Sequence, residues 1–334
     1  MRAGESNGLL RSFLRGRRAA TAAVVAVVLG LASGGAEAAD LAKVTVAVLP
    51  ALDAMPIYVA REKGYFTKAG IEADVQRFQG GPAVLESVLA GAAQFAIAGT
   101  VPFINATAHK AELRAIGVDA YFNSRTKTMG IFVKKDSGIR SVTDLAGRTV
   151  GINQRGNVES MIIRTRMLPK EGLKPSTLKI VELPYPLMQK SVAGGRVDAV
   201  ISFQPFSELM TKDPSLSLIA YLDTYIADPG YAITFAVVHA PYADQHPEVV
   251  RGYVSALNEA LDFARKNPDE AASIVAKAFN LPPSVVGPAL QSIQFANNEA
   301  EAEPKTWNNI VQVMKQIGAI PNSYDINSYI RLAH

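Results

Sequence analysis

The chain has 334 residues, a formal net charge of +4 and no cysteine, which excludes disulfides, thiol catalysis and a lipid anchor on a cysteine. Most of the charge lies in the first 38 residues, where five arginines face two glutamates. Residues 39–334 therefore keep 29 of the 34 basic and 28 of the 30 acidic side chains. Because this part is nearly neutral and has no basic run, we do not expect it to bind nucleic acid. Its length suggests two lobes rather than one small core.

The N-terminal segment has the pattern of a secretory signal peptide. Arginines within residues 11–18 precede an apolar run at residues 19–32, which is shorter than the roughly 20 residues that a membrane span needs. The Ala-Glu-Ala sequence at residues 36–38 predicts cleavage after Ala38. We therefore expect a protein of the Gram-negative periplasm. The arginine pair at residues 17–18 leaves the Sec and twin-arginine routes both open.

The first elements after this segment predict an α/β unit. Residues 43–49 alternate as a β-strand, residues 54–63 have helical spacing up to Gly64, and residues 73–78 form a second strand. A strand, a helix and another strand in this order are typical of a parallel sheet.

Residues 79–100 place glycines at the ends of two strands with one helix between them. Gly80 and Gly81 open the helix, and Gly99 and Thr100 follow the next strand, with Thr100 as the expected N-cap. Ligands of parallel α/β sheets bind beyond the carboxyl ends of the strands, where helix N-termini present free N–H groups. These positions therefore predict half of a binding cleft for a small anion. The alternative, that the glycines serve only tight turns, is equally consistent with the pattern.

The alternation of strands and helices restarts at residue 127 and predicts a second lobe. Its strands are expected at residues 128–133, 149–152, 178–183 and 197–203, and its helices at 158–168 and 187–193. Arg155, Gly156 and Asn157 follow one strand and open a helix, which repeats the arrangement of the first lobe. Arg155 is the one cation beside such a turn. It could pair with an anionic ligand or only line the rim.

The remaining residues predict a return to the first lobe. Residues 231–239 have the composition of a strand, and apolar stripes on residues 248–266 and 307–317 predict helices that cover it. We divide the chain into a signal peptide (1–38), the first part of lobe 1 (39–122), lobe 2 (123–224) and the remainder of lobe 1 (225–334).

The residue patterns typical of enzymes and metal sites are missing from the sequence. The four histidines are far apart, and no GxxxxGK[ST], GxSxG or HExxH motif occurs. Carboxylate pairs fall in the helical C-terminal part among other polar residues, as on a solvated face. We therefore assign no catalytic residue, no metal and no cofactor.

Several motifs together resemble the nitrate/sulfonate/taurine family of solute-binding proteins of ABC importers. They are AMPIYVAREKGYF at residues 54–66, AGI at 69–71, LAG at 89–91, FAIAG at 95–99, DSGI at 136–139, DLAG at 144–147, AGGRVDA at 193–199 and the turn at Pro205. The resemblance covers about residues 43–320. It implies a type II-like periplasmic-binding-protein fold, with two α/β lobes of mostly parallel sheets flanked by helices and a ligand cleft between the lobes. It also implies a membrane permease as partner, and we expect a monomer.

The resemblance also suggests which residues contact the ligand. They lie in the loop after the first strand and in the glycine and second-lobe turns: Leu52, Asp53, Met55, Gly80, Gly81, Gly99, Thr100, Arg155, Gly156, Asn157 and Gln204. Many family members carry a tryptophan, and often an acid, where this chain has Phe203 and Gln204. An acid there would suit an amine-bearing ligand such as taurine, so the neutral Gln204 favours a plain anion or a hydrogen-bonding neutral ligand.

Two classes of function fit these observations. The first is a binding protein for a sulfonate or similar organic anion, with nitrate, bicarbonate or a pyrimidine as alternative ligands. The second is an enzyme like the pyrimidine synthases of thiamine biosynthesis, which resemble this fold. Because the chain lacks the cysteine cluster of those enzymes and has an export signal, the sequence favours the binding protein.

Overall fold

The computed structural model describes residues 41–227, 230–296 and 304–332. The predicted signal peptide and its cleavage site at Ala38 lie outside these residues. In the described ranges no helix is long and apolar enough to cross a membrane.

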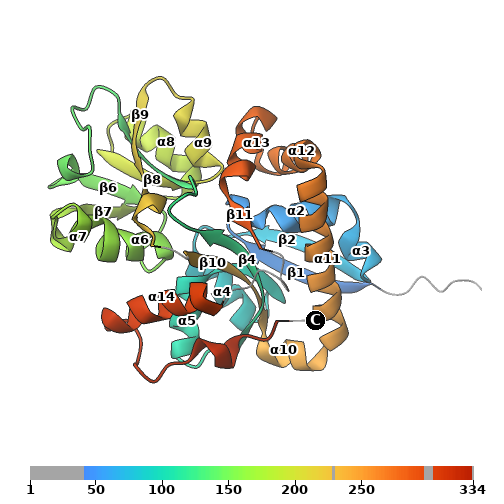
Figure 1. Cartoon of the computed structure of the whole chain (residues 1–334). Coiled ribbons are helices and arrows are strands. Elements are labelled where there is room, and N and C mark those ends of the chain that lie inside the picture. The colour runs from blue at the N-terminus through green and yellow to red at the C-terminus, as the bar shows by residue number, and fades with distance from the viewer. Residues whose placement is uncertain (1–40, 228–229, 297–303, 333–334) are drawn as a thin grey trace, which may run out of the picture. The chain divides into compact units, whose positions relative to one another are not determined.

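The first sheet contains strands from the beginning and the end of the chain (Figure 1). Its order is β11-β4-β10-β3-β1-β2, with β1 (Ala42–Val48), β2 (Ile71–Arg77), β3 (Phe95–Gly99), β4 (Leu113–Phe122), β10 (Tyr231–His239) and β11 (Gln294–Phe295). The β1 strand pairs in parallel with β2 and β3, whereas β10 runs antiparallel to both of its neighbours. The expected return of residues 231–239 to the first sheet is therefore confirmed.

The second sheet uses strands from the middle of the chain. Its order is β7-β6-β8-β5-β9, with β5 (Met129–Lys134), β6 (Thr149–Ile152), β7 (Lys179–Glu182), β8 (Ala199–Phe203) and β9 (Leu216–Tyr221). The β5 strand runs antiparallel to β8 and β9, and β6 runs parallel to β7 and β8. Both sheets are therefore mixed, with more antiparallel pairing than the alternating pattern suggested. The β9 strand had not been predicted. The division into lobes at residues 122/123 and 224/225 stays a prediction.

Helices flank both sheets (Figure 1). Those beside the first sheet are α2 (Met55–Glu62), α3 (Tyr65–Lys68), α4 (Gly81–Leu89), α5 (Thr100–Ala108), α10 (Ala240–Gln245), α11 (Pro247–Lys266), α12 (Pro268–Phe279), α13 (Pro283–Ser292) and α14 (Pro304–Gln316). Those of the second sheet are α6 (Val158–Ile162), α7 (Leu168–Lys170), α8 (Tyr185–Ala193) and α9 (Phe206–Thr211), with a π-helical segment at Ile163–Met167. The helix expected at residues 158–168 is therefore present as one continuous helical run over residues 158–170, with a π-helical segment in its middle.

The apolar stripe on α11 packs as its spacing predicts. Tyr253 stacks on Phe95 of β3 with ring centroids 4.0 Å apart, and on Phe66 of α3 at 5.6 Å. Ile317, which the predicted stripe on residues 307–317 included, follows the last residue of α14 and is exposed. The expected helix stop at Gly64 is confirmed, since Gly64 has φ of +73°, in the left-handed region that favours glycine, and Gly91 after α4 has the same φ.

Asp223 holds together the two segments that pass between the sheets. It lies in η5 (Leu222–Tyr225) and is completely buried. Its carboxylate accepts hydrogen bonds from the backbone of Thr128 and Met129 at 3.1 and 2.8 Å and from the Thr126 and Thr128 hydroxyls at 2.6 and 2.5 Å. The segment before β5 and the segment after β9 are therefore fixed to each other, which sets the orientation of the strand ends at the site.

Candidate functional site

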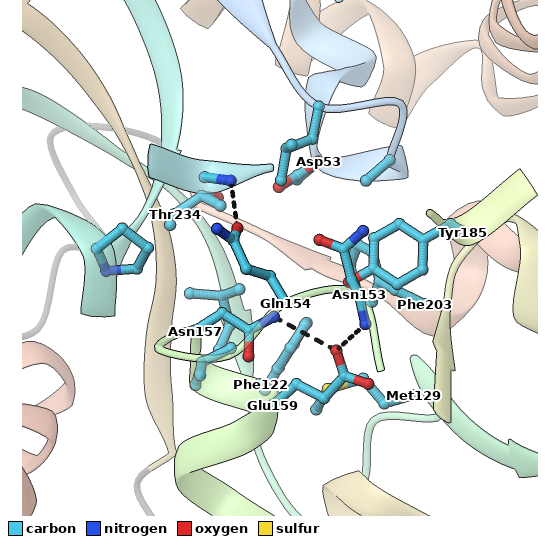
Figure 2. A pocket seen from close by; sticks show the side chains of 17 residues that line it. Asp53, Phe122, Met129, Asn153, Gln154, Asn157, Glu159, Tyr185, Phe203 and Thr234 are labelled. Atoms are coloured by element: carbon cyan, nitrogen blue, oxygen red, sulfur yellow. Dashed lines mark hydrogen bonds between the residues drawn. The ribbon is translucent and has the colours of Figure 1, made fainter. Parts of the chain in front are cut away.

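A pocket lies where loops and helices of the two sheets meet (Figure 2). Its lining comes from both sheets and comprises Leu49, Ala51, Asp53, Gly81, Gly99, Pro102, Phe122, Met129, Asn153, Gln154, Asn157, Val158, Glu159, Tyr185, Phe203, Ile233 and Thr234. The cavity volume is about 60 Å³, where one water needs about 10–15 Å³. In this conformation the pocket therefore suits a small ligand.

Asp53 contributes a carboxyl group from the side of the first sheet. It lies in η1 (Leu52–Ala54), directly after β1, and is 5% exposed. One carboxyl oxygen, Oδ1, is buried and has no hydrogen-bond partner. Burial raises the pKa of Asp53 to about 7, although backbone N–H groups at Asp53 and Ala54 act in the opposite direction.

Glu159 contributes a second carboxyl group from the side of the second sheet. It stands in the first turn of α6, and Asn157 is the N-cap, since its side chain accepts a hydrogen bond from the Ser160 backbone at 2.9 Å. Glu159 Oε2 accepts long hydrogen bonds of 3.4 Å from the Asn153 backbone and the Asn157 side chain. Glu159 Oε1 has no partner, and burial raises the pKa of this carboxyl group to about 8.

A third carboxyl group, Asp119 on β4, lies close to Asp53. The Thr234 hydroxyl donates a hydrogen bond to it at 3.0 Å. Burial raises the pKa of Asp119 well above its ordinary value, and the nearby charge of Asp53 raises it further. Two carboxylates in one buried region oppose each other's ionisation, so this side of the site favours a state in which protons or a cation compensate them.

Gln154 connects the two sides of the pocket. Figure 2 shows its side chain extending to the N-terminus of α4, where its Oε1 accepts a hydrogen bond of 2.8 Å from the Gly81 N–H. A Cβ at Gly80 would lie 2.7 Å from the same oxygen, so a larger residue there would displace the end of the Gln154 side chain. An N–H group expected to bind an anion is therefore already bonded to an amide oxygen of the chain itself.

Aromatic side chains form the apolar part of the lining. Phe203 lies between Phe122 and Tyr185, with ring centroids 5.4 and 6.3 Å away. Burial raises the pKa of the Tyr185 hydroxyl well above its ordinary value, so this group stays protonated and can donate or accept a hydrogen bond. These rings offer flat surfaces to a ligand.

Four of the eleven residues predicted to contact the ligand line this pocket. They are Asp53, Gly81, Gly99 and Asn157. Arg155 and Gly156 lie outside it and instead border two other pockets. The Arg155 guanidinium donates to the Ile180 carbonyl, and its closest carboxylate is Glu182 at 3.9 Å. Its position agrees with a residue at the rim rather than with a partner of the ligand.

The other five predicted residues do not line this pocket. Leu52 is buried, and its N–H donates to the Gln204 carbonyl at 3.0 Å. The Gln204 side chain donates to the Lys127 carbonyl and accepts from the Glu208 backbone. Met55 borders a separate cavity beside α12 and α13, and Gly80 lies next to Gln154 without lining the pocket.

The prediction that Thr100 is the N-cap of its helix is wrong by one residue. Gly99 is the N-cap residue of α5, whereas Thr100 is the first residue of the helix and makes no capping hydrogen bond. Its side chain is buried and its hydroxyl has no partner. The extended backbone required at the N-cap falls one residue earlier than the sequence pattern suggested.

Several residues of the pocket were missed by the sequence analysis, among them Asn153, Gln154, Glu159, Tyr185 and Phe122. Asn153, Gln154 and Glu159 lie in or just after the turn that contains the predicted Asn157. The polar residues within 153–159, after β6, could therefore have indicated that this turn contributes to the pocket. The aromatic residues carried no such signal, because an apolar residue at a strand end has the same pattern whether it packs in the core or lines a cavity.

Residues 51–271 match the family described as NMT1/THI5 like. The chain belongs to this family. It is 26% identical over 284 residues to a putative aliphatic sulfonates-binding protein of Bacillus subtilis, covering 82% of each chain. It is 23% identical over 286 residues to a putative thiamine biosynthesis protein of Haemophilus influenzae, covering 83% of this chain and 87% of the other.

Solved structures show the same fold. The alkanesulfonate-binding protein of Xanthomonas axonopodis pv. citri, bound to MOPS, superposes with a TM-score of 0.73 at 22% identity, covering 89% of this chain and all of the other. The expected two-lobed α/β periplasmic-binding-protein fold is therefore confirmed. At this level of identity the likeness concerns the fold, and the chemistry of the pocket must come from the residues of this chain.

Proposed function

We propose that this protein captures a small solute in the periplasm and delivers it to the permease of an ABC importer. The observation that carries the proposal is the pocket lined by residues from both sheets, in a chain of the NMT1/THI5-like family. The names of relatives support it, since they include sulfonate-binding and taurine-binding proteins. A sulfonate or similar organic anion is the ligand class that the sequence motifs suggest, with nitrate, bicarbonate and a pyrimidine as alternatives.

Catalysis like that of the pyrimidine synthases is the less favoured alternative. In the lining, the described side chains include carboxyl groups and a tyrosine hydroxyl but no cysteine or histidine. The pocket thus offers acceptors for a ligand rather than a nucleophile paired with a base. Detection of product from a candidate pyrimidine precursor would favour the enzyme.

We expect ligand binding to make the mature chain more compact. Because the binding groups are divided between the two sheets, a ligand binds better when they approach each other and shifts the population to the closed state. A thermal-shift screen over sulfonates, carboxylates, nitrate, pyrimidines and amines would identify a ligand. Small-angle scattering should then show a smaller radius of gyration when that ligand saturates the protein. An unchanged radius with a tight ligand would contradict hinged capture.

We also expect the exported protein to begin at Ala39. The arginine-flanked apolar run and the Ala-Glu-Ala sequence that ends at Ala38 are the basis for this expectation. Mass spectrometry of the N-terminal peptide from a periplasmic fraction measures it directly. Recovery of the uncleaved chain in the cytoplasm would count against both export and delivery to a permease.

A further inference from the structure

Two buried carboxyl groups of the pocket each keep one oxygen without a hydrogen-bond partner. Asp53 and Glu159 are 5% and 2% exposed, and their unpartnered oxygens are Oδ1 and Oε1. Figure 2 shows the two residues on opposite sides of the pocket, with Asn153 and Gln154 between them. Buried polar atoms without partners are uncommon in native proteins. A ligand that donates hydrogen bonds on both sides would satisfy them.

Two groups that the sequence suggested for an anion, the Gly81 N–H and Arg155, are engaged elsewhere. In the part of the lining that the structure describes there is no lysine, arginine or histidine. The Gly81 N–H at the start of α4 is bonded to Gln154 Oε1. Arg155 directly follows the lining residue Gln154 in sequence, but its guanidinium donates to the Ile180 carbonyl outside the pocket. An anion here would face carboxyl groups without a compensating charge.

The surroundings of both carboxyl groups add acidity and aromatic surface. Asp53 interacts electrostatically with Asp119 and with the hydroxyl of Tyr58, and Tyr185 interacts with both Asp53 and Glu159. The Glu159 carboxyl group is otherwise contacted by amide groups only. Rings such as those of Phe122 and Phe203 attract cations to their faces, so the apolar part of the lining does not oppose a positive charge.

We propose that the pocket recognises a small organic cation whose amine or amidine group donates hydrogen bonds to Asp53 and Glu159. The inference rests on the proposed solute capture, but it replaces the anionic ligand class that the sequence motifs suggest with a cationic one. Charge-assisted hydrogen bonds of this kind are the stronger ones in proteins.

The first test uses four probes of similar size that differ in charge. Acetamidinium, acetamide, acetate and ethanesulfonate are titrated separately into the mature chain at neutral pH, and binding is followed by NMR. We expect acetamidinium to bind with a dissociation constant on the order of 1 mM, at least tenfold more tightly than acetate and ethanesulfonate. Tighter binding of either anion would overturn the inference, and so would the absence of acetamidinium binding at 50 mM.

The second test uses variants that preserve shape. Asp53→Asn and Glu159→Gln should each weaken acetamidinium binding at least tenfold while acetamide binding changes by less than about threefold. Glu182→Gln is the matched control, because this carboxylate is exposed and lies outside the pocket. It should leave all affinities unchanged. If Asp53→Asn does not fold, the acetamidinium and acetamide affinities of Glu159→Gln alone decide between charge recognition and a structural role. Equal losses for acetamidinium and acetamide would indicate a structural role and contradict charge recognition.

Proton linkage gives a third, independent readout. A bound cation favours ionised carboxylates, so acetamidinium binding should release protons, whereas an anion held by protonated carboxyl groups would take protons up. Calorimetry at pH 7 in two buffers of different ionisation enthalpy measures the sign. If ethanesulfonate or nitrate binds with proton uptake, the inference fails but solute capture stands. If no compound of the broader thermal-shift screen binds, the proposed function itself fails.

Discussion

Replacing Asp223 by alanine is expected to lower the free energy of unfolding by about 3–5 kcal/mol. Its carboxylate accepts hydrogen bonds from the Thr126 hydroxyl, from the hydroxyl and N–H of Thr128 and from the N–H of Met129. Asp223 and Thr128 are completely buried. Alanine would therefore leave backbone and hydroxyl donors without an acceptor in a place that water does not reach. Urea unfolding of the purified variant measures the change.

The control is a second aspartate with charge-assisted bonds at the surface. Asp244 binds both guanidinium nitrogens of Arg114, at 2.5 and 2.8 Å, but its side chain is 62% exposed. Because water replaces the lost partner there, Asp244→Ala should lower the free energy of unfolding far less than Asp223→Ala does. Equal effects of the two substitutions would show that the buried network between the sheets does not stabilise the protein as we infer.

The order of elements was largely predictable because local patterns decide it. The glycines at residues 64 and 91 end helices where a left-handed residue is needed. The mostly apolar run at residues 231–239 forms a strand that is buried up to its last residue. The direction of that strand was less predictable. Antiparallel pairing of β10 between β3 and β4 depends on which sheet edge is free when the chain returns. No local pattern contains that information.

The polar contacts of the site were harder to predict, because they join residues distant in sequence. The bond between Gln154 and Gly81 spans 73 positions, so nothing near either residue indicates it. Glu159 resembles an ordinary acidic residue in the first turn of a helix, where the helix dipole stabilises negative charge. Only the packing of α6 against the pocket shows that this carboxyl group is buried. The sequence thus located the turns but did not reveal the buried carboxyl groups beside them.

The carboxyl groups of the pocket should also make stability depend strongly on pH. Burial raises the pKa of Asp53 from 3.8 to about 7 and that of Glu159 from 4.5 to about 8. Well below the unfolded pKa values of 3.8 and 4.5, each group is protonated in both the folded and the unfolded chain and adds no pH dependence. Between its unfolded and folded pKa values, each group is ionised in the unfolded chain but protonated in the folded one. Rising pH therefore stabilises the unfolded state relative to the folded state. Stability therefore falls as pH rises through this window.

The size of this loss is about 4 kcal/mol for each carboxyl group once pH exceeds its folded pKa. We expect the unfolding free energy of the ligand-free protein to decrease by several kcal/mol between pH 5 and pH 8, as measured by urea titration at fixed ionic strength. Asp119, whose pKa is also raised, contributes in the same direction.

Glu159→Gln identifies the carboxyl group responsible. Glutamine cannot ionise, so the decrease between pH 5 and pH 8 should become smaller by about 4 kcal/mol. At pH 8 this variant should then be more stable than the natural chain, although it binds acetamidinium more weakly. Glu182→Gln, at an exposed position, should keep the natural slope. An unchanged slope in Glu159→Gln would mean that Glu159 is already ionised and solvated in the folded protein. If the slope does change as expected, the same buried charge destabilises the empty protein and attracts a cationic ligand, so a bound cation should restore more stability at pH 8 than at pH 5.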